Sequence, residues 1–92
     1  MAKKAHYLRG AFGNAVLTYR KRAGLSAQGL ADIIGVDRKT IVKWENDKTL
    51  PYPTNWNKLI QWAENNPAVD SDALRRAYAK ALREYTEGVE RD

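Results

Sequence analysis

Cysteine is absent from the 92-residue sequence, and histidine occurs only once, as His6. Without cysteine the chain forms no disulfide and no thiolate metal site, and this composition is typical of proteins in a reducing compartment. The sequence also lacks a glycine-rich phosphate-binding loop and paired carboxylates at metal-ligand spacing. We therefore expect no enzymatic activity, no cofactor and no bound metal.

Long apolar segments are missing as well. No apolar run approaches the roughly 18 residues that are needed to span a bilayer. Lys3 and Lys4 are not followed by the apolar stretch of a secretory signal. The sequence predicts a cytoplasmic protein that has no membrane partner.

The charged residues are distributed unevenly along the chain. The formal net charge is +5, with ten Lys and Arg against four Asp and Glu in residues 1–50 and six against seven in residues 51–92. A basic half indicates a polyanionic partner such as nucleic acid, although basic charge alone is a weak indicator. The length and the 43% hydrophobic content suit one small globular domain with one core.

The segment 26–46 has the pattern of two short helices joined by a tight turn, because apolar residues recur at helical spacing in each half. Ser26 is a suitable N-cap for the first of these helices, and Gly35 is suited to the left-handed conformation that ends it. Asp37 is expected to cap the second helix by accepting hydrogen bonds from its first-turn N–H groups. The outward side of the second helix carries Arg38, Lys39, Thr40 and Lys43. This arrangement predicts a helix-turn-helix with a basic reading face.

A helix before this segment is predicted over residues 11–23, with Gly24 as its C-terminal stop. Arg20 lies on the same side of this helix as Phe12, which is unusual for a charged side chain. A half-buried arginine requires an acidic partner. Glu45 is the candidate for that partner.

Pro51 and Pro53 prevent the third helix from continuing. A fourth helix is predicted to begin after them, with Thr54 or Asn55 as its cap, and to end near residue 64. Trp62 lies off its apolar stripe. Two interpretations of Trp62 remain open: it packs beneath the C-terminal segment, or it forms a dimer contact.

The C-terminal segment is predicted to form a fifth, amphipathic helix, capped by Asp70 or Ser71 and ending near residue 87, with residues 88–92 frayed. Its apolar stripe either covers the helical body or pairs with a second copy of itself. The candidate dimer contacts are Trp62, Leu74, Tyr78, Leu82 and Tyr85.

These elements predict an all-α fold, a compact bundle of five helices in which the second and third form the helix-turn-helix. Three parts are expected: a basic arm at residues 1–10, a helix-turn-helix domain at 11–65 and the C-terminal helix at 66–92. The arm either contacts phosphates or a minor groove, or is a solvated terminus.

A specific combination of residues lies between positions 24 and 51: Gly24-Leu25-Ser26, Leu30-Ala31, Gly35-Val36, Thr40-Ile41, Trp44-Glu45-Asn46 and Pro51. This combination resembles the lambda-repressor-like helix-turn-helix family (XRE, Cro and phage-repressor type) over about residues 12–63. The resemblance implies a helical domain of bacterial or phage origin whose third helix lies in the major groove. Family members usually bind palindromic operators as dimers, with half-sites about one helical turn apart.

The resemblance also implies functional positions. The DNA base-reading residues would be Arg38, Lys39, Thr40 and Lys43, which favour a guanine-containing half-site. The phosphate contacts would be Gln28, Asn46 and Lys48. Arg20 and Glu45 match the family's structural ion pair between the first and third helices.

Two residues depart from the family pattern. Ala27 replaces the usual glutamine, with Gln28 one position later, and this puts the helix-2 phosphate contact in doubt. Asp47 replaces a common glycine. It either places an acid near the expected path of the phosphates, which would weaken binding there, or caps or turns the loop.

We therefore expect a sequence-specific DNA-binding regulator, a dimeric repressor, with double-stranded DNA and a second copy of the chain as its partners. The alternative is an antitoxin, a protein-interaction module that also binds DNA and neutralises a toxin with its C-terminal helix.

Overall fold

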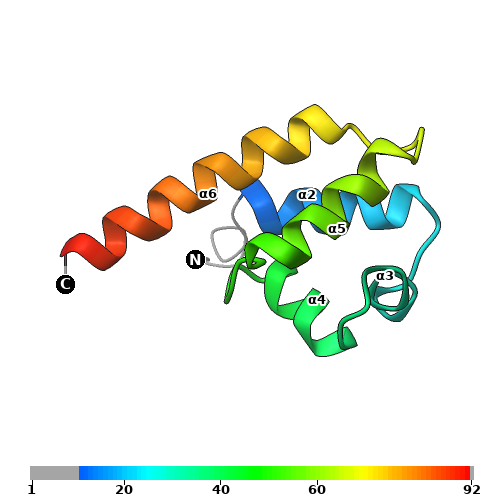
Figure 1. Cartoon of the computed structure of the whole chain (residues 1–92), viewed down its shortest axis with the longest axis horizontal. Coiled ribbons are helices and arrows are strands. Elements are labelled where there is room, and N and C mark those ends of the chain that lie inside the picture. The colour runs from blue at the N-terminus through cyan, green and yellow to red at the C-terminus, as the bar shows by residue number, and fades with distance from the viewer. Residues whose placement is uncertain (1–10, 92) are drawn as a thin grey trace, which may run out of the picture.

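The computed structural model describes residues 11–91, and the side chains of residues 11–84. Five helices and no strand occur in this part of the chain (Figure 1). They are α2 (Ala11–Arg22), α3 (Ala27–Ile34), α4 (Arg38–Glu45), α5 (Pro53–Glu64) and α6 (Ser71–Arg91). The all-α fold predicted from the sequence is confirmed. The predicted basic arm, residues 1–10, lies outside the described residues.

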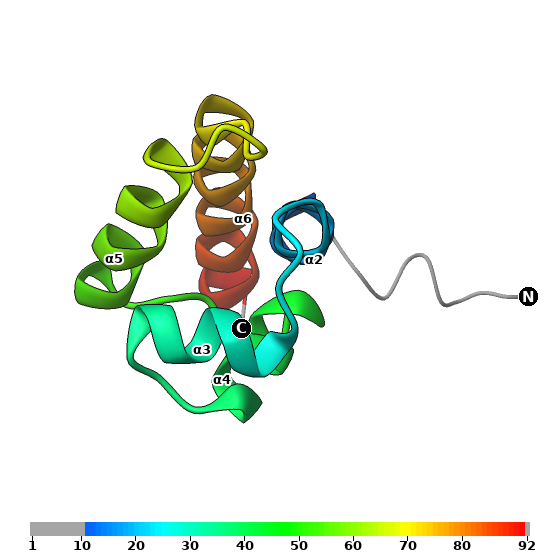
Figure 2. The same ribbon diagram turned by 90° about the vertical axis from the view of Figure 1, so that its right-hand side faces the viewer.

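The helix-turn-helix pair, α3 and α4, forms one end of the molecule, and α2, α5 and α6 stand beside one another above it (Figure 2). Helix α6 packs against α2 and α5, whereas α3 packs against α4 and α5. No described helix has the length and apolar character required to cross a membrane. The pair α3–α4 is therefore packed against the other helices on one side, and its opposite side is exposed to solvent.

The core lies where the five helices meet. Its buried apolar side chains are Phe12, Val16, Leu30, Ala31, Ile34, Ile41, Trp44, Leu59, Ile60, Ala63, Val69 and Leu74. An aromatic cluster extends this core toward α6, because the Tyr78 ring stacks on Trp56 at a centroid distance of 4.0 Å and lies 5.5 Å from Phe12. Every described helix contributes to the core, so the C-terminal helix is part of the same domain.

Two of the three predicted end signals around the turn form as expected. The Ser26 hydroxyl accepts a hydrogen bond from the Gly29 N–H at 2.9 Å at the start of α3. Gly35 ends α3 in the left-handed conformation, with φ of 86°. Asp37 occupies the N-cap position of α4, but its side chain makes no capping hydrogen bond. The expectation for the Asp37 side chain was wrong, although its backbone carbonyl accepts from Thr40 N.

Two helix boundaries also differ from the sequence-based expectation. Helix α5 begins at Pro53 with Tyr52 as N-cap, because a proline is well suited to the first turn, where no N–H partner exists. Helix α6 runs through Gly88 to Arg91, where fraying was expected after residue 87. Asp70 caps α6 as expected, since its Oδ1 accepts from Ala73 N at 3.0 Å.

Candidate nucleic-acid interface

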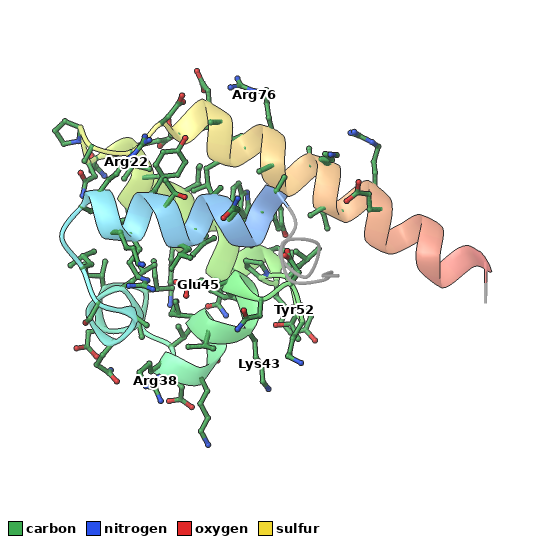
Figure 3. The ribbon with its side chains drawn as sticks, turned by 180° about the vertical axis from the view of Figure 1, so that it is seen from behind. Arg22, Arg38, Lys43, Glu45, Tyr52 and Arg76 are labelled. Atoms are coloured by element: carbon green, nitrogen blue, oxygen red, sulfur yellow. The ribbon has the colours of Figure 1, made fainter. Side chains whose placement is uncertain are left out.

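The outward side of α4 carries three exposed basic side chains, those of Arg38, Lys39 and Lys43. Figure 3 shows Arg38 and Lys43 pointing away from the helical body. The opposite side of α4 is buried, with Ile41 at 0% and Trp44 at 1% exposure. The fourth predicted base-reading residue, Thr40, is half-buried at the edge of this surface. The helix therefore presents cations to solvent and anchors itself with an apolar side, as the 3.6-residue period requires.

The C-terminal end of α4 is attached to α2 by an ion pair. Arg20 donates from Nε to Glu45 Oε2 at 2.6 Å and from Nη2 to Glu45 Oε1 at 3.2 Å, the two-pronged geometry that guanidinium favours. Its Nη1 also donates to the Leu25 carbonyl at 3.1 Å. Both side chains are largely shielded from solvent, at 12% and 6% exposure. This predicted pair is present, and it connects α2, α4 and the turn before α3.

A second link between α2 and the end of α4 was not anticipated from the sequence. Asp47 adopts a φ of 58°, a conformation that aspartate tolerates better than most residues. Its Oδ1 accepts a hydrogen bond from Gly13 N at 3.2 Å. The Asp47 carboxylate is therefore directed at the first turn of α2, where the helix dipole favours a negative charge.

Gly13 allows this close approach. A Cβ atom built on Gly13 would lie 2.3 Å from the Glu45 carbonyl oxygen and 2.7 Å from Asp47 Oδ2. Only glycine fits at such a crossing without movement of the backbone. The sequence signal was a glycine inside a predicted helix, and it was overlooked.

The three predicted phosphate contacts have different surroundings. Gln28 is exposed near the start of α3, and its Nε2 donates to Asp32 Oδ1 at 2.8 Å. Asn46 donates from Nδ2 to the Val42 carbonyl at 3.1 Å and thereby covers the last turn of α4. Lys48 is exposed in the following loop. Gln28 and Lys48 present their side chains at the surface, whereas the Asn46 amide supports the helix end.

The predicted dimer contacts on α6 divide into two groups. Leu74 is only 1% exposed and belongs to the core. Tyr78 is held in the aromatic cluster, and its hydroxyl donates to the Pro51 carbonyl at 2.8 Å. Leu74 is therefore used within one chain, which corrects its assignment to a dimer surface. Tyr78 is half-buried, and its dimer contact stays a prediction. Leu82 is 40% exposed and remains accessible, and the side chain of Tyr85 lies outside the described residues.

Trp62 is half-buried and packs against the core. It lines a surface hollow of about 290 Å³ together with Ile33 of α3, which is 53% exposed. The remaining lining residues are Lys58, Gln61, Asn65 and Asn66. Trp62 therefore borders a hollow that is shared by α3 and α5.

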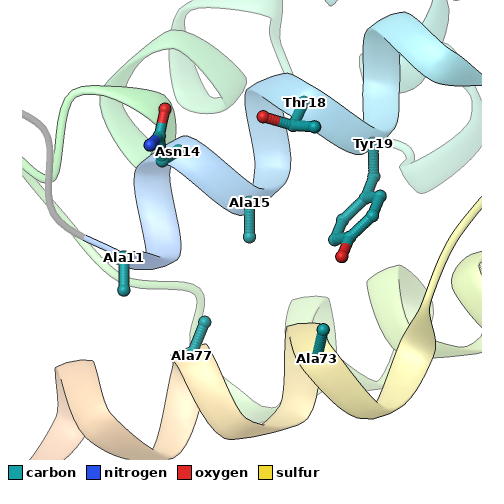
Figure 4. Close-up of a pocket in the computed structure, with 7 residues that line it drawn as sticks. All are labelled: Ala11, Asn14, Ala15, Thr18, Tyr19, Ala73 and Ala77. Atoms are coloured by element: carbon teal, nitrogen blue, oxygen red, sulfur yellow. The ribbon is translucent and has the colours of Figure 1, made fainter.

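A second hollow of about 270 Å³ lies between α2 and α6 (Figure 4). It is lined by Ala11, Asn14, Ala15, Thr18, Tyr19, Ala73 and Ala77. None of these residues is charged. Within residues 11–91, no group of three or more acidic, histidine or cysteine side chains could hold a metal ion. The exposed cations of α4 and its adjoining loop are the stronger candidate for binding an anionic partner.

One exposed aromatic residue beside α4 was not among the predicted contacts. Tyr52, in the loop between α4 and α5, is 80% exposed. Figure 3 shows it to the right of α4, close to Lys43, whereas Arg38 lies toward the other end of that helix. The sequence signal is the tripeptide Pro51-Tyr52-Pro53, whose prolines by themselves indicate only a break between helices.

A family model described as helix-turn-helix matches residues 16–61, half of the chain. The match begins within α2, contains α3 and α4, and ends within α5. It leaves α6 outside. No curated protein matches the chain.

Proposed function

This chain belongs to the XRE and lambda-repressor-like helix-turn-helix family of DNA-binding transcription regulators, and from that premise we propose that it is a sequence-specific repressor that binds a palindromic operator as a homodimer. Helix α4 lies in the major groove, where Arg38, Lys39 and Lys43 bind base edges. Thr40 binds a base edge or a phosphate. Gln28 and Lys48 bind phosphates, and Asn46 supports the end of α4.

The observation that carries this proposal is the division of α4 into a buried apolar side and an outward basic side. Arg38, Lys39 and Lys43 are exposed together on one short helix. Arginine and lysine donate to the O6 and N7 atoms of guanine in the major groove. We therefore expect guanine in each half-site.

Selection of bound sequences from random DNA, followed by quantitative binding to the selected operator, tests this proposal. Arg38→Ala and Lys43→Ala are each expected to weaken operator binding by about 1–3 kcal/mol and to relax the preference at one position. Arg76→Ala is the matched control, because Arg76 is an exposed arginine at the opposite edge of the molecule (Figure 3). Unchanged specificity in both α4 variants would contradict the assigned reading face.

The homodimer is proposed to form through the side of α6 that is not packed on the helical body. Helix α6 continues well beyond the helical body (Figure 1), and Leu82 is exposed on it. Residues 71–83 contain four basic residues against one acid, whereas residues 84–92 contain four acids against one basic residue. Opposite charges therefore face each other if two copies of α6 pair in antiparallel orientation.

Leu82→Arg in the full chain tests the dimer. Loss of this apolar contact is expected to raise the dimer dissociation constant roughly tenfold or more, as measured by sedimentation equilibrium. Ala68→Arg adds the same charge at an exposed position outside α6 and serves as the control. Equal dissociation constants for the two variants would refute the role of Leu82.

A second candidate function is that of an antitoxin, in which α6 binds a toxin instead of a second copy. The projecting end of α6 and the exposed Leu82 support this interpretation equally. Purification from the native host distinguishes the two functions. A stoichiometric protein partner that is lost in Leu82→Arg favours the antitoxin, and a homodimer without such a partner favours the repressor.

A further inference from the structure

We propose that Tyr52 contacts the DNA backbone, and that α6 sets its position through the hydrogen bond between the Tyr78 hydroxyl and the Pro51 carbonyl. This inference rests on the proposed DNA-binding function. It adds a contact residue, and it gives a role in DNA binding to a helix that lies outside the family match.

The Tyr52 side chain is accessible on the side of the molecule that carries the basic residues of α4. It is 80% exposed, and in Figure 3 it lies on the same edge as Lys43, with Arg76 at the opposite edge. The loop that bears it starts on the last turn of α4, where Lys48 N donates to the Lys43 carbonyl at 2.9 Å. Because this loop follows directly on the last turn of α4, entry of α4 into the major groove would bring the loop to the flanking sugar-phosphate backbone. A phenol there donates its O–H to a phosphate oxygen and packs its ring on a sugar.

The backbone at Tyr52 is restricted on both sides by proline. Pro51 is buried, and Pro53 is the first residue of α5. Tyr52 has φ of −69° and ψ of 162°, which is the extended conformation that a residue before proline favours. Because the backbone conformation is already fixed in the free protein, little backbone entropy is lost when the ring contacts DNA.

Tyr78 anchors the carbonyl group that immediately precedes Tyr52. Its hydroxyl donates to the Pro51 oxygen at 2.8 Å, although the two residues are 27 positions apart in the sequence. The Tyr78 ring cannot easily turn away, because it stacks on Trp56 with an interplanar angle of 11° and also contacts Phe12. Tyr78 is thus a positioning residue, which acts on DNA binding only through the loop.

The first experiment measures operator affinity by fluorescence anisotropy at several salt concentrations. Tyr52→Phe is expected to weaken binding roughly fivefold or more, because a hydrogen bond to a charged phosphate is lost. The slope of log K against log salt should stay unchanged, since a neutral phenol displaces no counterions. Lys48→Ala is the contrasting control, and it should reduce that slope by about one per protomer.

The second experiment tests the role of α6. Tyr78→Phe keeps the stacked ring and removes only the hydroxyl. It is expected to weaken operator binding in the same direction as Tyr52→Phe, again without a change of salt slope. In a Tyr52→Ala background, Tyr78→Phe should have no further effect on affinity, because the contact that it positions is already absent.

The outcomes separate this inference from the function on which it rests. Wild-type affinity in Tyr52→Phe overturns the contact, even when Arg38→Ala and Lys43→Ala lose specificity and the proposed function stands. A loss of affinity in Tyr52→Phe that sedimentation traces to dissociation of the dimer assigns Tyr52 to a protein interface and overturns the contact as well. Fully additive effects of Tyr52→Ala and Tyr78→Phe overturn the positioning role. Failure of the wild-type chain to select any DNA overturns both proposals.

Discussion

At the scale of single residues, Gly13 sets the distance between α2 and the end of α4. Its N–H reaches Asp47, and the space for a side chain is already occupied by the Glu45 carbonyl. A helix interior would otherwise favour alanine over glycine by about 1 kcal/mol. The requirement for close approach outweighs that preference at this position.

Gly13→Ala is therefore expected to destabilise the fold by roughly 1–3 kcal/mol, because α2 must move away from α4 to admit the methyl group. Gly29→Ala is the matched control inside α3, where a Cβ would lie 3.3 Å from its nearest neighbour, Ser26 Oγ. The free energy of unfolding of Gly29→Ala should equal that of the wild type or exceed it by up to about 1 kcal/mol. Urea unfolding of both proteins decides the point, and equal stability of Gly13→Ala and wild type would contradict the steric explanation.

At the scale of the helices, the start of α3 and the start of α4 are stabilised differently. The Ser26 side chain makes a capping hydrogen bond, whereas the Asp37 side chain makes none. The carboxylate of Asp37 can still interact with the dipole of α4. A capping hydrogen bond and a dipole interaction differ in strength, so the two helix starts should respond differently to truncation.

Ser26→Ala is expected to cost about 1 kcal/mol of unfolding free energy, since it removes the hydrogen bond to Gly29 N. Asp37→Ala should cost less, roughly 0.3–0.5 kcal/mol, because only the dipole interaction is lost. Thermal unfolding followed by circular dichroism compares the two variants. A larger loss in Asp37→Ala than in Ser26→Ala would show that the capping assignment is wrong.

The packing of α2 against α4 depends on the ion pair between Arg20 and Glu45. Arg20→Met leaves the Glu45 carboxylate shielded from solvent without its cation, and we expect a cost of about 3–5 kcal/mol. The double variant Arg20→Met/Glu45→Leu removes both charges and should recover much of that loss. Denaturant unfolding of the single variants and the double variant measures the coupling. Additive losses would mean that the two side chains contribute independently.

At the scale of the whole molecule, Tyr78 joins the C-terminal helix to the loop after α4 and to the core. Burial raises the pKa of the Tyr78 hydroxyl above 10.0, since the phenolate is poorly solvated there. The folded state therefore favours the neutral phenol. The stabilisation that comes from this neutral phenol is fully present below pH 10.0, the pKa of Tyr78 in the unfolded chain. It is lost as the pH rises through the higher pKa of Tyr78 in the folded protein.

We expect the free energy of unfolding of the wild-type protein to fall as the pH rises above about 10. Part of this fall should be absent in Tyr78→Phe, which has no proton to lose at that position. Urea unfolding of both proteins across this range tests the expectation, and the difference between them removes the contribution of other groups that titrate there. Identical pH dependence would indicate that Tyr78 ionises equally in the folded and unfolded states.

The sequence by itself determined the features that depend on neighbouring residues. Helical periodicity gave the buried side of α4 and its outward cations, and Ser26 and Gly35 marked the two ends of α3, because caps and amphipathic faces arise within a few residues. Arg20 and Glu45 were paired from the sequence because a charge on an apolar side requires a partner.

Only the tertiary structure decided which groups meet across long separations of the chain. Gly13 and Asp47 lie 34 positions apart, and Pro51 and Tyr78 lie 27 apart. No local pattern encodes such contacts, since they depend on how the helices pack. The same packing placed Leu74 and Tyr78 within the core and left Leu82 exposed. An amphipathic stripe shows that one side of a helix is to be buried, whereas the fold decides which neighbour buries each of its residues.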